Sequence, residues 1–98
     1  MELRFHSAAR TELLDAIRWY AARSERAKEG FLDELAFVVS RMREAPLRWP
    51  VYLHGTRKAR LRRFPFAAVY HLGVEVLHVV AIAHLHRRPG YWRDRVTD

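Results

Sequence analysis

The sequence predicts an α+β domain in which a helical hairpin packs on a small, mainly antiparallel β-sheet, in the element order βααβββ. Three observations lead to this prediction. Residues 8–44 carry apolar side chains at helical spacing, and residues 57–84 alternate or run apolar as strands do. The length of 98 residues allows one hydrophobic core, so residues 1–98 are expected to form a single domain.

The first strand is expected in the segment ELRFH, because Leu3 and Phe5 alternate with polar neighbours. Ser7 is expected to cap a helix that begins at Ala8, since its hydroxyl can accept a backbone N–H of the first turn. That helix is expected to end near Arg23. Its apolar side consists of Leu13, Ile17 and Tyr20.

A second helix is expected over Glu25–Glu44, after the short polar connection ARSERAK. Pro46 ends it, because the residue before a proline disfavours helical backbone. Two helices joined by so few residues must lie antiparallel as a hairpin. The apolar stripe of the second helix consists of Phe31, Leu35, Val38 and Met42.

The next segment, Leu47 to Thr56, has no clear period and is expected to be a loop. In the stretch RKARLRRFPF that follows, Ala59 and Leu61 are expected on one face of a strand. Pro65 lacks an N–H donor and is expected at a strand end, an edge or a bulge. The opposite, basic face of this strand would carry Lys58, Arg60 and Arg62.

The last two strands are expected in AAVYHL and EVLHVVAIAHL, joined by a two-residue turn at Gly73-Val74 with glycine in its first central position. Apolar residues on both faces of the last segment indicate a central strand. Strict alternation would place Leu77, Val79, Ala81 and Ala83 on one face. It would place Val76, His78, Val80, Ile82 and His84 on the other.

The composition excludes several classes of chemistry. The chain has no cysteine, so it has neither disulfides nor thiolate zinc sites nor a thiol nucleophile. The N-terminal residues lack the apolar core of a signal peptide, and the most apolar run is interrupted by polar residues too often to span a membrane. We expect a cytoplasmic protein.

The net charge of +7 is confined to the second half of the chain. Residues 1–44 contain eight basic and eight acidic side chains, whereas residues 45–98 contain ten basic and three acidic ones. A polyanion or an acidic protein segment would therefore be attracted to the second half. The alternative is a solvated basic face without a partner.

Two histidines in the segment AHLHRRPGYW are candidate metal ligands, because His84 and His86 lie on one side of an extended strand. Zinc sites usually need three or four protein ligands, and no cysteine is available. We therefore expect neither a metal nor another cofactor, and these histidines are expected to be structural or exposed to solvent.

The basic and aromatic residues of the second half can form a binding surface, since guanidinium groups bind phosphates and aromatic rings stack on bases or fill grooves. The alternative for the aromatics is that Tyr91 and Trp92 only cover the sheet edge. Metal-independent RNA cleavage would need proton-transfer groups, available in His84, His86 or Tyr91. A cation to stabilise the transition state would come from Arg62, Arg63, Arg87 or Arg88.

The helical segments FHSAARTELLDAIRWY and GFLDELAFVVSRMREAP are followed in order by two more specific pieces, LRRFPF..VY and VAIAH..R.PGYW. With these segments, nearly the whole chain resembles the RelE/ParE superfamily of type II toxin–antitoxin toxins. The resemblance implies the RelE/ParE fold and a cognate antitoxin whose acidic, partly disordered segment folds on the toxin. It also implies contact with operator DNA only through the antitoxin.

Two activities divide that superfamily, and the resemblance favours the first. ParE-like toxins inhibit DNA gyrase by binding it, and then no catalytic residue is expected. RelE-like toxins cleave mRNA on the ribosome, and then the catalytic residues would be Arg62, Arg63, Arg87 and Tyr91. Under either activity, the residues expected to bind antitoxin or target are Lys58, Arg60, Arg62, Arg87, Arg88, Tyr91 and Trp92. A nucleic-acid-binding domain without toxicity is the third hypothesis.

Overall fold

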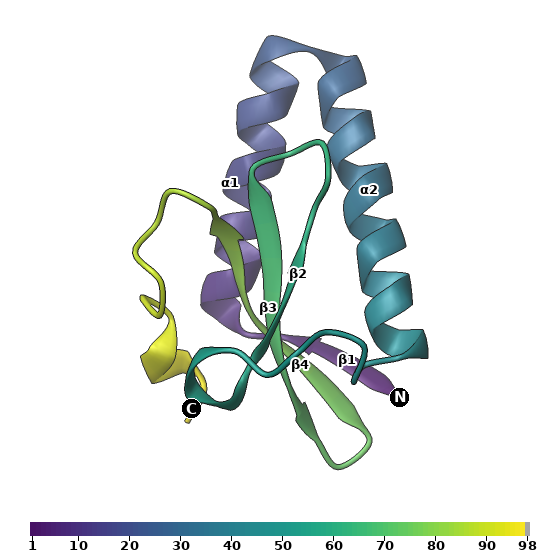
Figure 1. The fold of residues 1–98 in the computed structure, drawn as a ribbon. Coiled ribbons are helices and arrows are strands. Elements are labelled where there is room, and N and C mark those ends of the chain that lie inside the picture. Colours follow the sequence, from purple (N-terminus) through teal and green to yellow (C-terminus); the bar gives the residue numbers. More distant parts are fainter. Residues whose placement is uncertain (98) are drawn as a thin grey trace.

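A computed structural model describes residues 1–97 and confirms the predicted fold class and element order (Figure 1). The chain forms, in order, β1 (Glu2–Phe5), α1 (Ser7–Arg23), α2 (Glu25–Glu44), β2 (Arg57–Arg60), β3 (Phe66–Gly73) and β4 (Val76–His84). Two short 3₁₀ turns, Leu53–Gly55 and Arg93–Arg95, complete the described elements.

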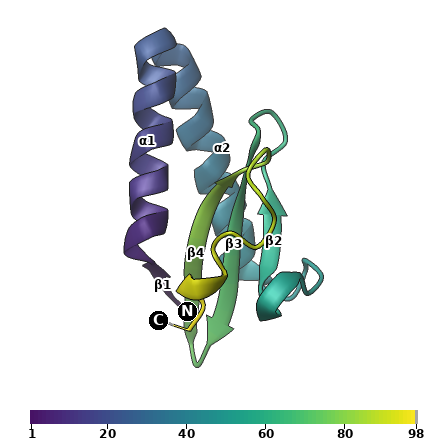
Figure 2. The same ribbon diagram turned by 90° about the vertical axis from the view of Figure 1, so that its left-hand side faces the viewer.

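The four strands form one sheet in the order β1-β4-β3-β2. β1 runs parallel to β4, and the other two pairs are antiparallel. β4 is therefore a central strand, as its two apolar faces predicted. Figure 2 shows both helices on one side of the sheet and the Leu53–Gly55 turn on the other. Within residues 1–97, neither helix combines the length and apolarity needed to cross a bilayer.

The helical hairpin has a shorter connection and a different first cap than expected. Ser24 alone separates the helices, and its hydroxyl accepts the N–H of Ala27 at 3.2 Å. α1 begins at Ser7, and the cap is His6, whose Nδ1 accepts the N–H of Ala8 at 3.0 Å. The prediction of Ser7 as the cap was wrong because Ser7 is already helical, whereas His6 has the extended backbone that a cap needs.

The main hydrophobic core lies between the hairpin and the sheet. Tyr20 of α1 stacks on Phe31 of α2 with ring centroids 5.1 Å apart. Phe64, just before β3, meets Tyr20 edge to face at 5.1 Å. Such aromatic pairs add to the free energy gained from burial alone. Other buried members of this core are Ala9, Ala16, Leu35, Val38, Met42, Ala59, Leu61, Ala68, Tyr70, Leu77, Val79 and Ile82.

A β-bulge in β4 changes which side chains face the helices. Val69 of β3 pairs with Ala81, but Tyr70 pairs with Val79, so Val80 is an extra residue in β4. An extra residue reverses the alternation beyond it. Ile82 therefore joins Leu77 and Val79 in the main core, whereas Ala81 and Ala83 face the opposite side. The predicted faces of β4 were wrong from Ala81 onward for this reason.

The β3–β4 turn lies one residue later than predicted. Gly73 still pairs with Val76, and the two turn residues are Val74 and Glu75. Glu75, not glycine, has the left-handed backbone, with φ of 56°. At Gly73 the contact is tight instead, because a Cβ there would lie 3.1 Å from Nε2 of His78.

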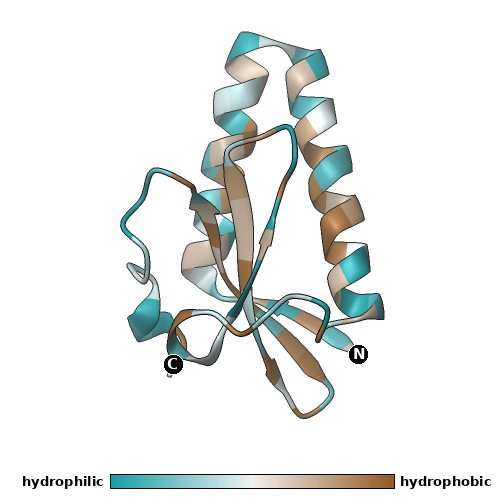
Figure 3. Cartoon of the chain, viewed as in Figure 1, coloured by the Kyte–Doolittle hydropathy of each residue, from teal (hydrophilic) through white to brown (hydrophobic). Residues whose placement is uncertain are grey.

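A second, smaller core covers the other face of the sheet. It is built around Trp92, which is 2% exposed. Tyr52, Tyr91 and Val96 pack against it from the segments that follow α2 and β4. The central strands are accordingly apolar, whereas the loop after β4 is hydrophilic (Figure 3). The buried sheet residues of this core are Val69, Val80, Ala81 and Ala83.

Acid is expected to destabilise the domain through a stacked histidine pair. His71 of β3 and His78 of β4 stack with centroids 4.7 Å apart and ring planes at 14°. Burial lowers the pKa of His71 below its ordinary value of 6.5, and the nearby His78 lowers it further. A lowered pKa favours the neutral ring in the folded state, so its stabilising effect is complete above pH 6.5 and is lost as the pH falls below that value.

Urea unfolding at about pH 8 and about pH 5 tests this expectation, since histidine titrates between these values. The variant His71→Gln should lose less stability on acidification than the wild type. His86→Gln, at an exposed position, is the control and should retain the wild-type response. An unchanged response in His71→Gln would contradict the assignment.

Candidate functional site

The most connected polar group of the described chain is the carboxylate of Glu12 on α1. Its oxygens accept the N–H of Ile82 at 3.0 Å and the hydroxyl of Tyr91 at 2.7 Å. They also form a double hydrogen bond with the guanidinium of Arg95, at 2.9 and 3.1 Å. Nη1 of Arg87 lies 3.9 Å away. This Glu12 cluster joins α1, β4 and the C-terminal segment.

The cluster forms where β1 stops covering β4. The last paired residues of β1 and β4 are Phe5 and Val79. Beyond that point the chain leaves the sheet to form α1, and the edge of β4 is open. Glu12 binds the amide of Ile82, and Nη1 of Arg95 donates to the carbonyl of Val80 at 3.0 Å. The ion pair thus satisfies one donor and one acceptor that a neighbouring strand would otherwise bind.

Neither Glu12 nor Arg95 was among the residues singled out from the sequence. A usable signal for Glu12 was its spacing, because it lies four residues before Ala16 and eight before Tyr20, on the buried side of α1. A carboxylate on a buried stripe needs a cation or several donors. The position of the partner, 83 residues away, had no comparable local signal.

Tyr91 is held by the Glu12 cluster as a hydrogen-bond donor. Burial raises the pKa of its phenol, and the hydrogen bond to the Glu12 carboxylate raises this pKa further. Arg87 stacks on the Tyr91 ring, with its guanidinium carbon 3.8 Å from the centre of that ring. The phenol is therefore neutral at ordinary pH, and its hydroxyl proton is donated in the hydrogen bond to Glu12.

Trp92, which the sequence placed on the binding surface, lies in the second core. Its ring contacts those of Tyr52 and His54, with centroids 6.2 and 5.9 Å away. The role of Trp92 in binding remains a prediction, and only 2% of this residue is accessible to a partner.

The predicted basic residues fall into two groups at the rim of the sheet. Lys58, Arg87 and Arg88 surround a small hollow beside Tyr91. Arg60, Arg62 and Arg63 line a second hollow, together with His86. The sheet face opposite the helices carries the second core, and Tyr91 and Trp92 of that core line the hollow beside Lys58, Arg87 and Arg88.

Arg62 and Arg63 belong to the β2–β3 loop, whose backbone is held by Glu34 of α2. The carboxylate accepts the N–H of Arg62, the N–H of Arg63 at 3.2 Å and Nε of Arg63 at 3.1 Å. Burial acts to raise the pKa of Glu34, but these hydrogen bonds outweigh it and lower that pKa. The expectation that Arg62 continues the alternation of β2 was wrong, because the strand ends at Arg60.

The two histidines considered as metal ligands interact with each other. Nδ1 of His84 accepts the backbone N–H of His86 at 3.1 Å, and the centroids of the two rings lie 4.9 Å apart. His84 also packs edge to face on Phe66 at 5.1 Å. Over residues 1–97, no group of three or more histidine, aspartate or glutamate side chains is arranged to hold a metal ion.

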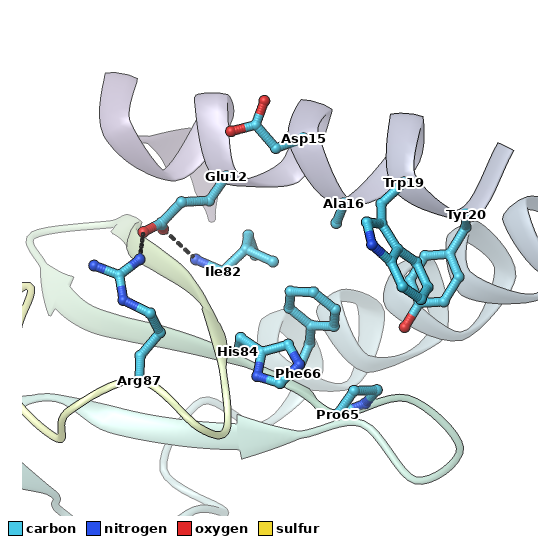
Figure 4. A pocket seen from close by; sticks show the side chains of 10 residues that line it. All are labelled: Glu12, Asp15, Ala16, Trp19, Tyr20, Pro65, Phe66, Ile82, His84 and Arg87. Atoms are coloured by element: carbon cyan, nitrogen blue, oxygen red, sulfur yellow. Dashed lines mark hydrogen bonds and ion pairs between the residues drawn. The ribbon is translucent and has the colours of Figure 1, made fainter. Parts of the chain in front are cut away.

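A cavity of about 360 Å³ lies between α1 and the C-terminal end of β4 (Figure 4). Trp19 and Tyr20 stand at one end, and Glu12 and Arg87 at the other. Its walls are mostly apolar, and the remaining residues that line it are Asp15, Ala16, Pro65, Phe66, Ile82 and His84.

The fold and site together describe a small α+β protein with two basic groups at the rim of its sheet and a mostly apolar cavity beside α1. Comparison with family models matches residues 3–89 to the ParE toxin of the type II toxin–antitoxin system parDE. The chain therefore belongs to the ParE toxin family. No curated protein matches the sequence.

A solved structure shares the fold. It is a chain of the chromosomal ParDE toxin–antitoxin system from P. aeruginosa, with a TM-score of 0.64 and 18% sequence identity. The similarity covers 88% of the present chain and 97% of that chain. The family-model match agrees with the family suggested by the sequence resemblance, and the solved structure agrees with the predicted fold.

Proposed function

We propose that this toxin inhibits DNA gyrase by binding it and that a cognate antitoxin neutralises it. The observation that carries the proposal is the match to the ParE toxin family over residues 3–89. A toxin with this target would act in the cytoplasm. Its partners would be gyrase and the antitoxin, and operator DNA would be contacted only through the antitoxin.

The arrangement of the basic residues supports a binding role. The rim groups Lys58, Arg87 and Arg88, and Arg60, Arg62 and Arg63, belong to the half of the chain that carries the whole net charge of +7. An acidic antitoxin segment would be attracted to this half. Such electrostatic attraction raises the rate of association more than it raises the affinity. No metal or cofactor is needed for inhibition by binding.

The alternative, ribosome-dependent mRNA cleavage, has less support from the geometry. Tyr91 would need to take or give a proton at a phosphate, yet its hydroxyl is bonded to Glu12 and its pKa is raised. Arg62 and Arg63 line a different hollow from Arg87 and Tyr91. This arrangement gives less support to one reacting position shared by the four residues.

A supercoiling assay tests the proposal directly. Purified gyrase is titrated with the toxin, with and without the antitoxin of the same operon. We expect supercoiling to fall with toxin and to recover when antitoxin is added. Unchanged supercoiling at saturating toxin would contradict gyrase inhibition, and codon-positioned cuts in primer extension on translated mRNA would favour cleavage instead.

Reversing one rim charge is expected to slow antitoxin binding. In Arg88→Glu, an exposed guanidinium is replaced by a carboxylate, and we expect the association rate constant to fall about tenfold at low salt. The matched control is Arg26→Glu, an exposed position on the helical hairpin outside both rim groups. Binding kinetics at two salt concentrations would measure the difference, and equal rates for the two variants would contradict a role for the rim.

A further inference from the structure

The two hollows at the rim of the sheet adjoin each other, because Leu85 lines both of them. They also meet along β2, where Lys58 lines one hollow and Arg60 lines the other. Ala59, between these two residues, is buried in the main core, so strand alternation directs Lys58 and Arg60 to the face away from the helices. The two hollows therefore form one continuous band of the surface.

Four cations in this band have no acidic partner. Over residues 1–97, the side chains of Arg60, Arg62 and Arg88 take part in no hydrogen bond or ion pair. Lys58 has no ion pair either, and its ammonium lies over the Tyr52 ring at 4.4 Å. No acidic side chain of the described residues lines either hollow. The basic track, as we name Lys58, Arg60, Arg62 and Arg88, is therefore positively charged without internal compensation.

The fold holds part of the basic track in place without neutralising it. Glu34 accepts the backbone N–H of Arg62 and pairs with the side chain of Arg63, so the guanidinium of Arg62 stays unpaired. Pairing of β2 with β3 fixes the backbone of Lys58 and Arg60. Side chains on an ordered backbone lose less conformational freedom when they bind a ligand, so this arrangement favours binding.

The chemistry of the track favours phosphate groups as ligands. A guanidinium can bind a phosphate through two parallel N–H bonds, and a lysine binds it as a point charge. The hollow beside Tyr91 has a volume of only about 50 Å³, which leaves little room for a large apolar side chain of a protein partner. The hollow of Arg60 and Arg62 is larger, at about 450 Å³, and arginines surround it. A band of unpaired cations is suited to a polymer that carries closely spaced phosphates.

We propose that the basic track binds the phosphate backbone of duplex DNA, and that the toxin thereby contacts the DNA held by gyrase as well as the enzyme. The inference rests on the proposed inhibition of gyrase, whose substrate is duplex DNA, and it specifies a second ligand at that target. Phosphate contacts carry no base sequence, so this surface does not select the operator. The attraction of an acidic antitoxin to the same half of the chain needs only the long-range field of these charges.

Binding of the toxin alone to a labelled duplex of about 20 base pairs, followed by fluorescence anisotropy, tests the track. If each of the four cations neutralises one phosphate, the logarithm of the binding constant should fall against the logarithm of salt concentration with a slope of about −3.6. The double variant Arg60→Gln, Arg88→Gln should raise the Kd for DNA at least tenfold at low salt and make the slope shallower by about 2.

The matched control is the double variant Arg10→Gln, Arg26→Gln. It removes the same two charges from exposed positions on the helical hairpin, where neither side chain has an ion pair within residues 1–97. We expect a Kd within about threefold of the wild type and the wild-type slope. All four positions are on the surface, so both double variants are expected to fold, and thermal unfolding would verify it. An equal loss in the two double variants would reduce DNA binding to general attraction and overturn the proposal.

A second measurement connects the track to gyrase. The Kd of the toxin for purified gyrase is determined with and without a bound DNA duplex. The wild type and the hairpin control should bind the gyrase–DNA complex at least fivefold more tightly than DNA-free gyrase. The variant Arg60→Gln, Arg88→Gln should lose this difference, because it lacks half of the cations that contact the phosphates.

The outcomes separate this inference from the proposed function. If the toxin inhibits gyrase but binds it equally with and without DNA, the DNA contact is wrong and gyrase inhibition stands. If gyrase is not inhibited while DNA binding still depends on the track, the proposed function is wrong and the phosphate-binding surface stands. Binding at least tenfold tighter to a single-stranded RNA with the same number of phosphates would assign the track to RNA and overturn the proposal.

Discussion

Replacing Glu12 by alanine is expected to lower the free energy of unfolding by about 3 kcal/mol, because it leaves a largely buried guanidinium without its counter-ion. The side chains of Glu12 and Arg95 are 15% and 19% exposed. The variant also leaves the amide of Ile82 and the hydroxyl of Tyr91 without an acceptor. An unsatisfied buried donor is itself costly.

Three variants define this effect in urea unfolding. Glu12→Gln keeps an acceptor for Ile82 and should lose about half as much stability as Glu12→Ala. The double variant Glu12→Ala, Arg95→Ala should be less destabilised than the sum of the two single variants, since the residues interact directly. The control is Asp15→Ala, one turn away and exposed, with an expected change within about 0.5 kcal/mol. A loss below about 1 kcal/mol for Glu12→Ala would contradict the role of the cluster.

Replacing Trp92 by alanine is expected to cost about 4 kcal/mol, which is a large part of the stability of a domain of this size. Trp92 fills the second core against Val69, Val80 and the sheet alanines. Truncation leaves a cavity between the sheet and the C-terminal segment. That segment also carries Arg95, so the Glu12 cluster would weaken with it.

Comparison of two tryptophans tests whether Trp92 is structural. Trp19→Ala removes an equally large ring from an exposed position and should change stability by less than about 1 kcal/mol. Trp92→Phe should recover more than half of the loss, because an aromatic ring still fills the core. If Trp92→Ala unfolds at the wild-type urea concentration but loses antitoxin affinity, the ring serves recognition and its placement in the core is wrong.

The helical hairpin and the order of elements along the chain could be predicted from the sequence because their signals are local. α2 has the predicted bounds Glu25–Glu44, since a regular stripe and Pro46 define it without reference to the rest of the chain. The predicted cap at Ser7 and turn at Gly73 were each off by one residue. Both depend on backbone angles that several neighbouring residues can adopt.

The candidate site was less predictable. The residue types of the basic rim were evident from composition. Their division into two groups depends on where β2 ends and on the hydrogen bonds by which Glu34 holds the β2–β3 loop. Nothing in the local pattern placed Trp92 in a core, because the bulge at Val80 decides which residues of β4 face it.

The fold class, the family and the half of the chain that carries the charge could all be inferred from the sequence. Periodicity, prolines and charge counts act over a few residues, so they can be read along the chain. The pairing of Glu12 with Arg95, the second core and the open edge of β4 depend on the three-dimensional fold. These features join residues far apart in sequence, and they exist because buried charges and backbone groups must find partners wherever the folded chain brings them.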